Sequence, residues 1–353
     1  MKTIFIRPFS CPSHKVAEVR ERARPRRPAL RFAILLPILS LGFGAAGAGA
    51  QPAPVASTAV DSATSTTLRR DDLRVALVAY RLALAGTALC TERHPLTGML
   101  FHHLAEYEPG DRPLMVARYG LDRGPGVLTV LSDSPAARAG LIAGDVLLAV
   151  NGRPLPTGTS VAAEPKREKW RRLTDESEAE LETALRRGPA ELRVLREGRE
   201  VALRLGSLPA CLGRVRLARS TQVNAFATGR TVVMTTAMLK FIRGDGELAV
   251  VLGHELAHNI FGHRQMRNEE GILRGLGLKP SAVWKREEAA DRFGLRLMSA
   301  AGYDLDAAIP FWRRYLGKYD WFPQIFRSHP SLGARERIAA EEIAAIRREK
   351  AGL

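Results

Sequence analysis

The feature that most constrains this chain is an apolar helix that carries three histidines and a glutamate. The stretch GHELAHNIFGH occupies residues 253–263. The apolar positions around it recur every four residues: Leu248, Leu252, Leu256 and Ile260. This spacing predicts a helix, capped at Asp245, whose apolar stripe faces a core. His254 and His258 then lie one turn apart on one face, where a single divalent ion can be held by both imidazoles.

A second helix, expected from a cap at Ser281 to about Ala301, offers a third ligand. Glu287 and Asp291 are four residues apart and share one face of that helix. Glu287 completes a two-histidine, one-carboxylate set whose fourth position is open to water, as catalytic zinc requires. Asp291 is then placed to accept a hydrogen bond from the outer nitrogen of a ligand histidine. Taken alone, these two carboxylates also fit an ordinary charged helix face.

Glu255 follows the first ligand and can approach a metal-bound water without binding the metal, as in the H-E-x-x-H arrangement of zinc peptidases. The expected cofactor is therefore one Zn²⁺ per chain. His263 is out of register with the third histidine of the longer H-E-x-x-H-x-x-G-x-x-H pattern, because Arg264 occupies that position. We expect His263 behind the ligands or at the surface. His102 and His103 are expected to be packing or surface histidines.

A second motif lies upstream. The run SPAARAGLIAGDVLLAVNG, residues 134–152, is followed by a helix near residues 176–187 and by a hairpin that turns at Glu197-Gly198. Residues 112–206 resemble bacterial PDZ domains, although the charged insertion at 153–174 departs from compact members and is expected to be solvated. The resemblance implies a groove for extended peptides or C-termini, either open or packed against a neighbouring module. Its carboxylate-binding loop corresponds to Tyr119, Gly120 and Leu121.

Residues 208–345 resemble the M48 family of zinc metallopeptidases. The matching motifs, in order, are Asn224-Ala225-Phe226-Ala227, ELAVVLGHELAHNIFGH, Glu287-x-x-Ala290-Asp291, Gly302-Tyr303-Asp304 and Ser328-His329-Pro330. The resemblance implies zinc ligands at His254, His258 and Glu287 and a catalytic glutamate at Glu255. It also implies a substrate cleft along Asn224, Ala225 and Phe226. It assigns His329 to the active site together with an arginine, for which Arg335 fits the spacing and Arg337 the local context.

The N-terminus predicts export. Residues 1–50 combine a basic region, an apolar run and an Ala-Gly-Ala site, and this pattern is typical of a cleaved signal peptide, with an uncleaved anchor as the alternative. Of the formal net charge of +16, this segment carries +7. The rest of the chain can approach an anionic membrane face, but no basic-aromatic patch indicates nucleic acid. In an oxidising envelope, Cys90 and Cys211 form either a disulfide or two separate buried thiols.

These features predict an α+β multidomain protein. After the signal peptide and a linker at 51–66, we expect a helical segment at 67–111 that packs on the peptidase, a PDZ β-barrel-like domain at 112–206, and a mainly helical, zincin-like peptidase domain with a small edge-strand sheet at 207–353. The predicted function is a zinc endopeptidase of the periplasm or envelope that acts in protein quality control with PDZ-assisted recognition of protein substrates. The alternative is a peptide-binding scaffold or chaperone with a non-catalytic metal site.

Overall fold

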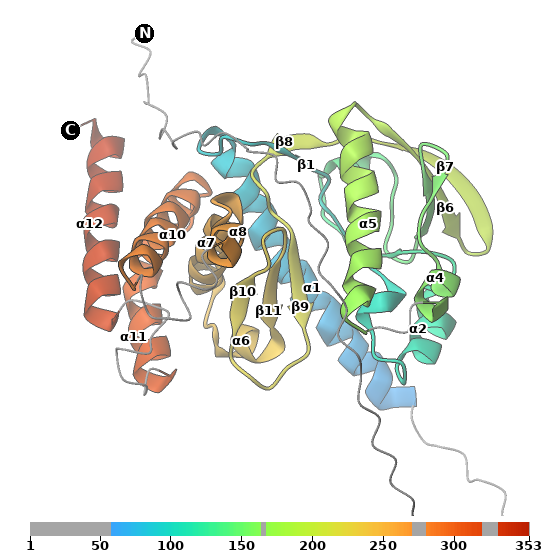
Figure 1. Ribbon diagram of the computed structural model, residues 1–353, viewed down its shortest axis with the longest axis horizontal. Helices are drawn as coiled ribbons and strands as arrows, with labels where there is room; N and C mark the ends of the chain where they lie inside the picture. Colours follow the sequence, from blue (N-terminus) through green and yellow to red (C-terminus); the bar gives the residue numbers. More distant parts are fainter. Residues whose placement is uncertain (1–57, 164–166, 270–279, 320–330, 353) are drawn as a thin grey trace, which may run out of the picture. The chain divides into compact units, whose positions relative to one another are not determined.

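A six-stranded antiparallel sheet occupies the first half of the part of the chain that a computed structural model describes, which is residues 58–163, 167–269, 280–319 and 331–352 (Figure 1). The strand order is β2 (Met99–His102), β3 (Gly126–Val130), β4 (Val146–Val150), β6 (Ala190–Arg196) and β7 (Arg199–Leu205), and β5 (Arg153–Pro154) pairs with β4. The predicted hairpin at Glu197-Gly198 is confirmed, because β6 and β7 pair antiparallel there and both turn residues have positive φ.

Helices accompany this sheet: α2 (Arg112–Tyr119), α3 (Pro135–Arg138), α4 (Gly158–Ala163) and α5 (Arg167–Arg186). The helix expected near residues 176–187 is the second half of α5. The insertion at 153–174, expected to be solvated, instead forms β5, α4 and the first turns of α5. Val161 and Thr174 are buried within it, so that expectation was wrong for this part of the segment. Apolar residues from the strands and from α5, among them Leu147, Leu192 and Leu185, form one core cluster.

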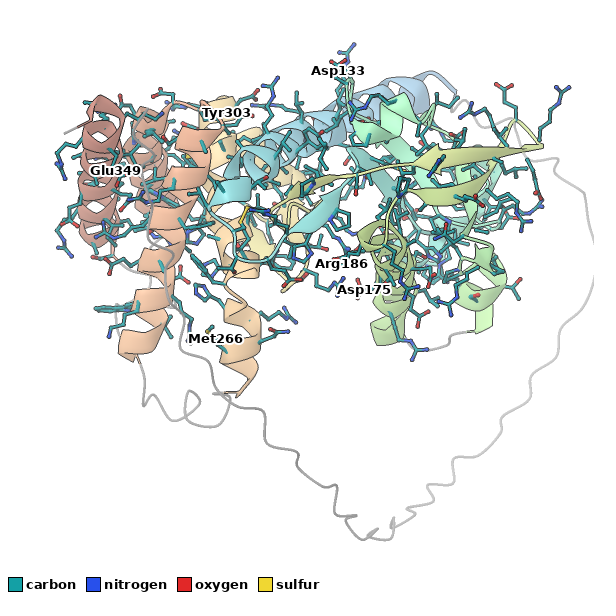
Figure 2. The ribbon with its side chains drawn as sticks, turned by 90° about the horizontal axis from the view of Figure 1, so that it is seen from above. Asp133, Asp175, Arg186, Met266, Tyr303 and Glu349 are labelled. Atoms are coloured by element: carbon teal, nitrogen blue, oxygen red, sulfur yellow. A yellow bond between two sulfur atoms is a disulfide. The ribbon has the colours of Figure 1, made fainter. Side chains whose placement is uncertain are left out.

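The sheet is inserted between two segments that belong to a second, larger core. Helix α1 (Thr58–Ala85) precedes it and packs in that core. The chain then passes through β1 (His94–Leu96), which pairs antiparallel with β8 (Leu208–Ala210) where the chain returns. Beside this pair, a disulfide joins Cys90 and Cys211, drawn in yellow in Figure 2. The structure thus selects the disulfide over two separate thiols.

The segment at 67–111 was expected to be a helical element of the peptidase domain. Its first part is helical, as the end of α1, but β1 and β2 follow, with the short 3-10 turns η1 (Gly86–Ala88) and η2 (Leu104–Glu106) around them. β2 pairs with β3 and is therefore part of the six-stranded sheet. His102, the last residue of β2, and the following His103 are buried, and their ring nitrogens contact Tyr107 Oη and the Pro156 carbonyl respectively. The sheet therefore begins before residue 112.

A second, three-stranded sheet stands at the start of the larger part. Its order is β10 (Ala225–Ala227), β11 (Val232–Thr235) and β9 (Val215–Ala218), so β10 is an edge strand. β10 and β11 form the hairpin expected within residues 224–236, whereas β9 runs parallel to β11. This hairpin turns at Gly229, whose φ is +98°. The edge strand contacts the helix that carries the histidines.

Helices complete this part: α6 (Thr236–Phe241), α7 (Asp245–Ile260), α8 (His263–Glu269), α10 (Pro280–Ala300), η3 (Leu305–Ala307), α11 (Ala308–Tyr319) and α12 (Leu332–Ala351). The predicted stripe on α7 is confirmed, since Leu248, Leu252 and Leu256 are fully buried. Two helix starts differ from the expected caps. Gly244 caps α7, with Asp245 in the first turn, where its charge suits the helix dipole, and α10 begins before Ser281.

The observed elements form an α+β multidomain fold, as the sequence predicts. The residues expected to form the signal peptide, and 51–57 of the expected linker, lie outside the described part of the chain. Among the residues that are described, none of the helices combines the length and apolar character that crossing a bilayer requires.

Candidate metal centre

The site depends on an unusually close crossing of α7 and α10. The two helices meet at Gly253 and Gly294, where a Cβ atom added to Gly294 would stand 2.9 Å from the backbone nitrogen of His254. A Cβ added to Gly253 would stand 3.0 Å from the Gly294 carbonyl oxygen. Only hydrogen fits between the backbones at these distances. The crossing therefore places the first histidine of α7 directly beside the acidic face of α10.

Three donor groups converge at this crossing. The Nε2 atoms of His254 and His258 lie 3.1 Å apart. Glu287 faces both, with one carboxylate oxygen 3.5 Å from His254 Nε2 and the other 3.4 Å from His258 Nε2. All the donor atoms lie within 4.8 Å of one another. This is the set of residues that the sequence predicted as metal ligands, brought together from two helices.

A buried second layer orients these donors. Asp291 Oδ1 lies 2.8 Å from Nδ1 of His254, so that this ring can donate outward while Nε2 faces the other donors. The Arg335 guanidinium reaches the site from α12, with Nη2 3.1 Å from Glu287 Oε2 and Nη1 3.3 Å from Asp291 Oδ1. It lies over the ring of Trp312 at 4.0 Å from the ring centroid.

The charges of the site fit a bound cation. Among the described residues, Glu287 and Asp291 are buried with Arg335 between them, so these two carboxylates outnumber the guanidinium when both imidazoles are neutral. Burial alone would lower the pKa of His254, but the hydrogen bond and charge of Asp291 raise that pKa to about 10. Without a metal ion, the site therefore stabilises a positive charge on the first imidazole. Two imidazoles and a carboxylate are also a donor set that zinc uses.

His263 also belongs to this site. Its Nδ1 atom lies 2.9 Å from Nδ1 of His258, on the side of the ring that faces away from Glu287. Burial, followed by the charge of His258, lowers the pKa of His263 to about 3. A neutral His263 can accept a hydrogen bond from the outer nitrogen of His258. The turn through Gly262, whose φ is +64°, brings His263 back over the end of α7.

The remaining predicted active-site residues are distributed unevenly. Glu255 lies on α7 next to His254 and is half-buried. Arg335 is buried at the site, whereas Arg337 is exposed, 3.8 Å from Glu341 on the same helix. The two candidate arginines therefore differ clearly in position. His329 lies outside the residues that the structure describes.

The predicted substrate strand is β10. Asn224, immediately before it, and Phe226 are exposed, while Ala225 is half-buried. Because β10 is the outer strand of its sheet, one row of its backbone groups has no partner strand among the described elements. The Gly229 N–H donates to Asn259 Oδ1 at 2.7 Å, which fixes the end of the hairpin beside the last turn of α7.

The three residues expected to bind a peptide carboxylate occupy a different place. Tyr119 ends α2 and packs edge-on against His102, Gly120 takes the left-handed conformation that ends the helix, and Leu121 is fully buried in a small apolar cluster. None of the three lines the cavity beside the outer strand β2, which contains Leu96, Gly98 and Phe101 instead.

Sequence patterns did not indicate Gly294 or Trp312 as parts of the site, and they left open whether His263 lies behind the ligands or at the surface. Gly294 has no motif of its own, but it faces the glycine that precedes His254. Trp312 lies on α11, which the sequence linked to the site by no pattern. The contact of His263 with His258 could have been found from the helix break at Gly262, which allows the chain to fold back.

The fold and the site together define a metallopeptidase-type domain that accompanies a second domain built on the six-stranded sheet. The Peptidase family M48 model matches residues 191–276 and 281–343, and a PDZ domain model matches residues 126–164. The second part of the chain is therefore similar to peptidase family M48, and residues 126–164 are similar to PDZ domains.

One curated relative is the mitochondrial metalloendopeptidase OMA1 of Arabidopsis thaliana, 31% identical over 143 residues. The match covers 34% of this chain and 29% of that protein, so it spans less than a third of the relative. Among solved structures, the HtrA3 PDZ domain bound to a phage-derived ligand is 21% identical, with a TM-score of 0.24, over 33% of this chain and 89% of that chain. The HtrA-type protease AlgW with a decapeptide is 23% identical, with a TM-score of 0.21, over 33% and 30%.

Proposed function

We propose that this chain is a zinc-dependent endopeptidase that cleaves protein substrates of the cell envelope. The observation that carries the proposal is the convergence of His254, His258 and Glu287 beside a glutamate that is not among the donors. The match of residues 191–276 and 281–343 to a metallopeptidase family supports it. We take the three donors as the ligands of one Zn²⁺, a choice that agrees with the preference of zinc for imidazole and carboxylate.

When bound, zinc would supply the Lewis acid that polarises the scissile carbonyl and increases the acidity of water. The protein supplies the proton transfers. Glu255 accepts a proton from the attacking water and returns it to the leaving amine. Its half-buried position on α7 suits both tasks, since the carboxylate is adjacent to a ligand and remains open to solvent. Asp291 holds the ring of His254 in the tautomer that leaves Nε2 free.

Arg335 and His329 complete the proposed machinery. The buried guanidinium of Arg335 bridges Glu287 and Asp291, and thereby holds α12 against the donors on α10. By family resemblance, we propose that His329 donates a hydrogen bond to the oxyanion that develops on the substrate carbonyl. A neutral or protonated imidazole can serve as this donor, because either form carries an N–H.

The proposed substrate lies extended along β10. The exposed edge of that strand can add a substrate strand through backbone hydrogen bonds, so binding depends little on side-chain identity. A cavity of about 510 Å³ continues from the hairpin turn, and both Arg230 of that turn and Arg186 of the PDZ helix α5 line it. A substrate held on β10 can therefore also contact the PDZ domain, and we propose that this domain assists substrate recognition.

We place this activity in the periplasm or cell envelope, in protein quality control. The disulfide between Cys90 and Cys211 supports an oxidising compartment, and the N-terminal pattern supports export. A sequence-tolerant edge strand suits the cleavage of unfolded proteins. Glu255 argues against the alternative of a scaffold with a structural metal site. Such a site needs ligands but no base, and it fills its fourth position with a protein side chain.

The test compares casein cleavage by the zinc-loaded chain, by the same chain after chelation, and by the variant Glu255→Gln. We expect the variant to retain zinc and to lose about 10²–10⁴-fold in rate, because the proton transfers no longer have a base. Glu288→Gln, directly after the ligand Glu287 in the chain but paired with Arg292 at 2.9 Å, is the matched control and should keep full activity. Equal cleavage in all arms would rule out zinc proteolysis.

A further inference from the structure

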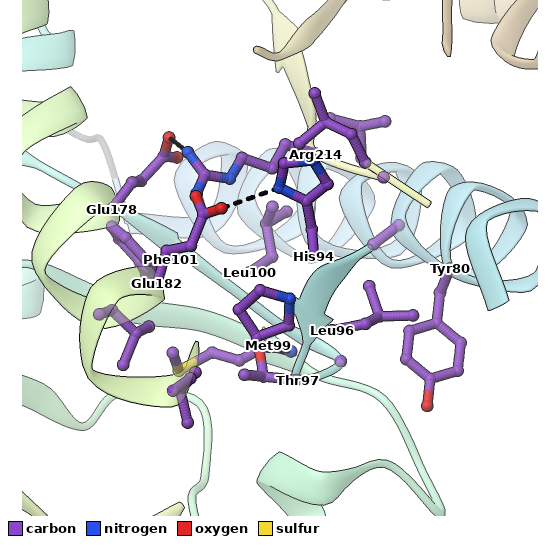
Figure 3. A pocket seen from close by; sticks show the side chains of 18 of the residues that line it. Tyr80, His94, Leu96, Thr97, Met99, Leu100, Phe101, Glu178, Glu182 and Arg214 are labelled. Carbon is purple, nitrogen blue, oxygen red and sulfur yellow. Dashed lines mark hydrogen bonds and ion pairs between the residues drawn. The ribbon is translucent and has the colours of Figure 1, made fainter. Parts of the chain in front are cut away.

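β2, an outer strand of the six-stranded sheet, faces a narrow cavity. β2 has no strand on its outer edge among the described elements. Opposite β2, the side chains of Glu178, Leu181, Glu182 and Leu185 line the cavity from one face of α5. An outer strand and a helix placed side by side in this way can accept an extended peptide by strand addition. Figure 3 labels residues of both walls, Met99 and Phe101 of β2 and Glu178 and Glu182 of the helix.

This cavity is already partly filled by the chain itself. Residues 211–215, which run from the end of β8 into the first residue of β9, form a third wall. Ala76 and Tyr80 of α1 form a fourth. The remaining volume is about 120 Å³. Ligand pockets of proteins generally hold about 300–1,000 Å³. The cavity can therefore accept a side chain but not an extended peptide, unless residues 212–215, which follow the disulfide-bonded Cys211, move away.

Arg214 is the residue of this segment that binds α5. Its guanidinium donates to Glu178 at 2.8 Å and also pairs with Glu182 (Figure 3). Both glutamate side chains are about one-tenth exposed, at 11% and 9%. Burial alone would raise the pKa of Glu182, but its bonds to His94 and the charge of Arg214 lower it to about 2. Glu182 is therefore a carboxylate that needs cationic partners.

In one network of described side chains beside α5, the carboxylates and arginines are equal in number only while Arg214 is present. Four carboxylates are linked there to four arginines: Glu92, Glu106, Glu178 and Glu182 with Arg186, Arg214, Arg216 and Arg230. If Arg214 left the cavity, one carboxylate of this network would be in excess, and Glu178 and Glu182 are largely buried. A buried charge without a partner is unfavourable. A peptide that enters the cavity must therefore supply the missing positive charge.

We propose that Arg214 closes the groove between β2 and α5 as a built-in competitor, and that the groove opens to an extended peptide with an arginine or lysine that replaces Arg214. Residues 212–215 lead directly into β9, which is one edge of the three-stranded sheet whose other edge is β10. Replacement of Arg214 by a peptide cation would therefore also release β9. Peptide binding at the PDZ domain and the position of the substrate strand are thereby linked through residues 215–218.

The test uses the full chain carrying Glu255→Gln, so that probes are bound but not cleaved. The probes are short fluorescein-labelled peptides of serine, alanine and valine that differ in one residue, which is arginine, glutamine or glutamate and is moved through the sequence. Binding is measured by fluorescence anisotropy. We expect the best arginine peptide to bind Arg214→Ala about ten-fold more tightly than the chain with Arg214. Adding Glu178→Gln should remove its advantage over the glutamate peptide.

Arg204→Ala, at an exposed position on β7, is the matched control and should bind like the parent chain. Thermal melting establishes that each variant is folded, and Arg214→Gln replaces Arg214→Ala if the latter is not. Equal affinity of parent and variant, no binding to the folded variant, or glutamate peptides that bind as well as arginine peptides would each overturn the proposal. The assay measures binding alone, so its outcome does not depend on the proposed peptidase activity.

Discussion

At His254, neighbours on both sides of one imidazole restrict how the ring can lie. Asp291 holds Nδ1 at 2.8 Å, and the Trp312 ring packs edge-on with its centroid 5.8 Å away. The other nitrogen then faces His258 and Glu287. The ring is therefore oriented before any ion binds, and the cost of arranging this ligand is met by folding rather than by metal binding.

We predict that the hydrogen bond between Asp291 and His254 increases the affinity of the site for zinc. In Asp291→Asn the amide can present its N–H₂ to His254 Nδ1, which disturbs the tautomer that exposes Nε2. We expect the affinity for Zn²⁺ to fall about 10–100-fold, measured by competition with a chelating dye. Glu288→Gln on the same helix should leave the affinity unchanged. An Asp291→Asn protein that binds zinc as tightly as the parent would show that this hydrogen bond does not orient the ligand.

We also predict that His263 contributes to zinc affinity, and that one of two substitutions at this position preserves its role. In His263→Phe the outer nitrogen of His258 loses its acceptor, so zinc affinity should fall about ten-fold. His263→Asn keeps an acceptor oxygen close to the position of Nδ1, and should recover most of that loss in the same dye competition. If the Phe and Asn variants behave alike, the 2.9 Å contact between the rings has no role in orienting His258.

At the scale of elements, the crossing of α7 and α10 determines whether the donors meet. We expect Gly294→Ala to reduce the free energy of unfolding by about 1–3 kcal/mol, because the added methyl overlaps the backbone at Gly253. Gly317→Ala is the matched control. Gly317 lies on α11 with no atom within 4 Å of an added Cβ, so this variant should be more stable by up to about 1 kcal/mol.

Urea unfolding of both variants measures this difference, since the same chemical change is expected to act with opposite sign at the two helices. Stabilisation by Gly294→Ala would mean that the helices do not cross at this distance. A parallel zinc titration of Gly294→Ala should show weaker binding, because separating the helices moves Glu287 away from the two histidines.

The ion pairs of Glu182 on α5 with Arg214 and Arg230 predict that the stability of the protein depends on pH. The pKa of Glu182 is about 2 in the folded chain, against an ordinary value of 4.5. A lowered folded-state pKa stabilises the protein above the unfolded value, and this contribution is lost as pH falls from about 4.5 toward 2. The melting temperature of Glu182→Gln should therefore lie below that of the parent at neutral pH, and the two should approach each other in acid.

The control for this pH dependence is Glu191→Gln, at an exposed position on β6. Its melting curve should follow that of the parent from neutral to acid pH. A gap between the parent and Glu182→Gln that stays constant down to pH 2 would show that the glutamate acts by packing rather than by charge.

At the scale of the whole chain, the PDZ domain is an insertion between α1 and the peptidase sheet. The disulfide Cys90–Cys211 joins the two ends of the insertion across 121 residues, with the Cα atoms 5.7 Å apart. We expect the double variant Cys90→Ala, Cys211→Ala to lose about 2–5 kcal/mol in its free energy of unfolding, measured in urea against the oxidised parent. An unchanged unfolding free energy would indicate that the disulfide does not constrain the unfolded chain.

Patterns in the sequence predicted those features that depend only on residues close together in the chain. The i, i+4 spacing of His254 and His258, the acidic pair on α10 and the turn at Glu197-Gly198 each describe neighbours along one element, so periodicity reveals them. The meeting of α7 with α10 was expected from the family resemblance, and its cause, the contact of two glycines, was not.

Long-range arrangements were beyond the sequence because they depend on how separate segments pair. β2 consists of four residues, Met99–His102, and has no alternation that would mark a strand. It forms because β3 offers it a partner. The peptide-binding assignment of Tyr119, Gly120 and Leu121 followed a short motif, whereas Leu121 is buried in a separate cluster. The partners of Arg214 could not be predicted from spacing, since Glu178 and Glu182 lie on an element of the inserted domain.

Whether His254, His258 and Glu287 bind one zinc ion is tested directly by a crystal of the zinc-loaded chain, with diffraction measured on both sides of the zinc absorption edge. We expect one strong anomalous peak bound by Nε2 of His254, Nε2 of His258 and a carboxylate oxygen of Glu287, with Glu255 outside the ligand set. A peak elsewhere, a peak that Glu287 does not reach, or no peak where the three side chains meet would contradict it.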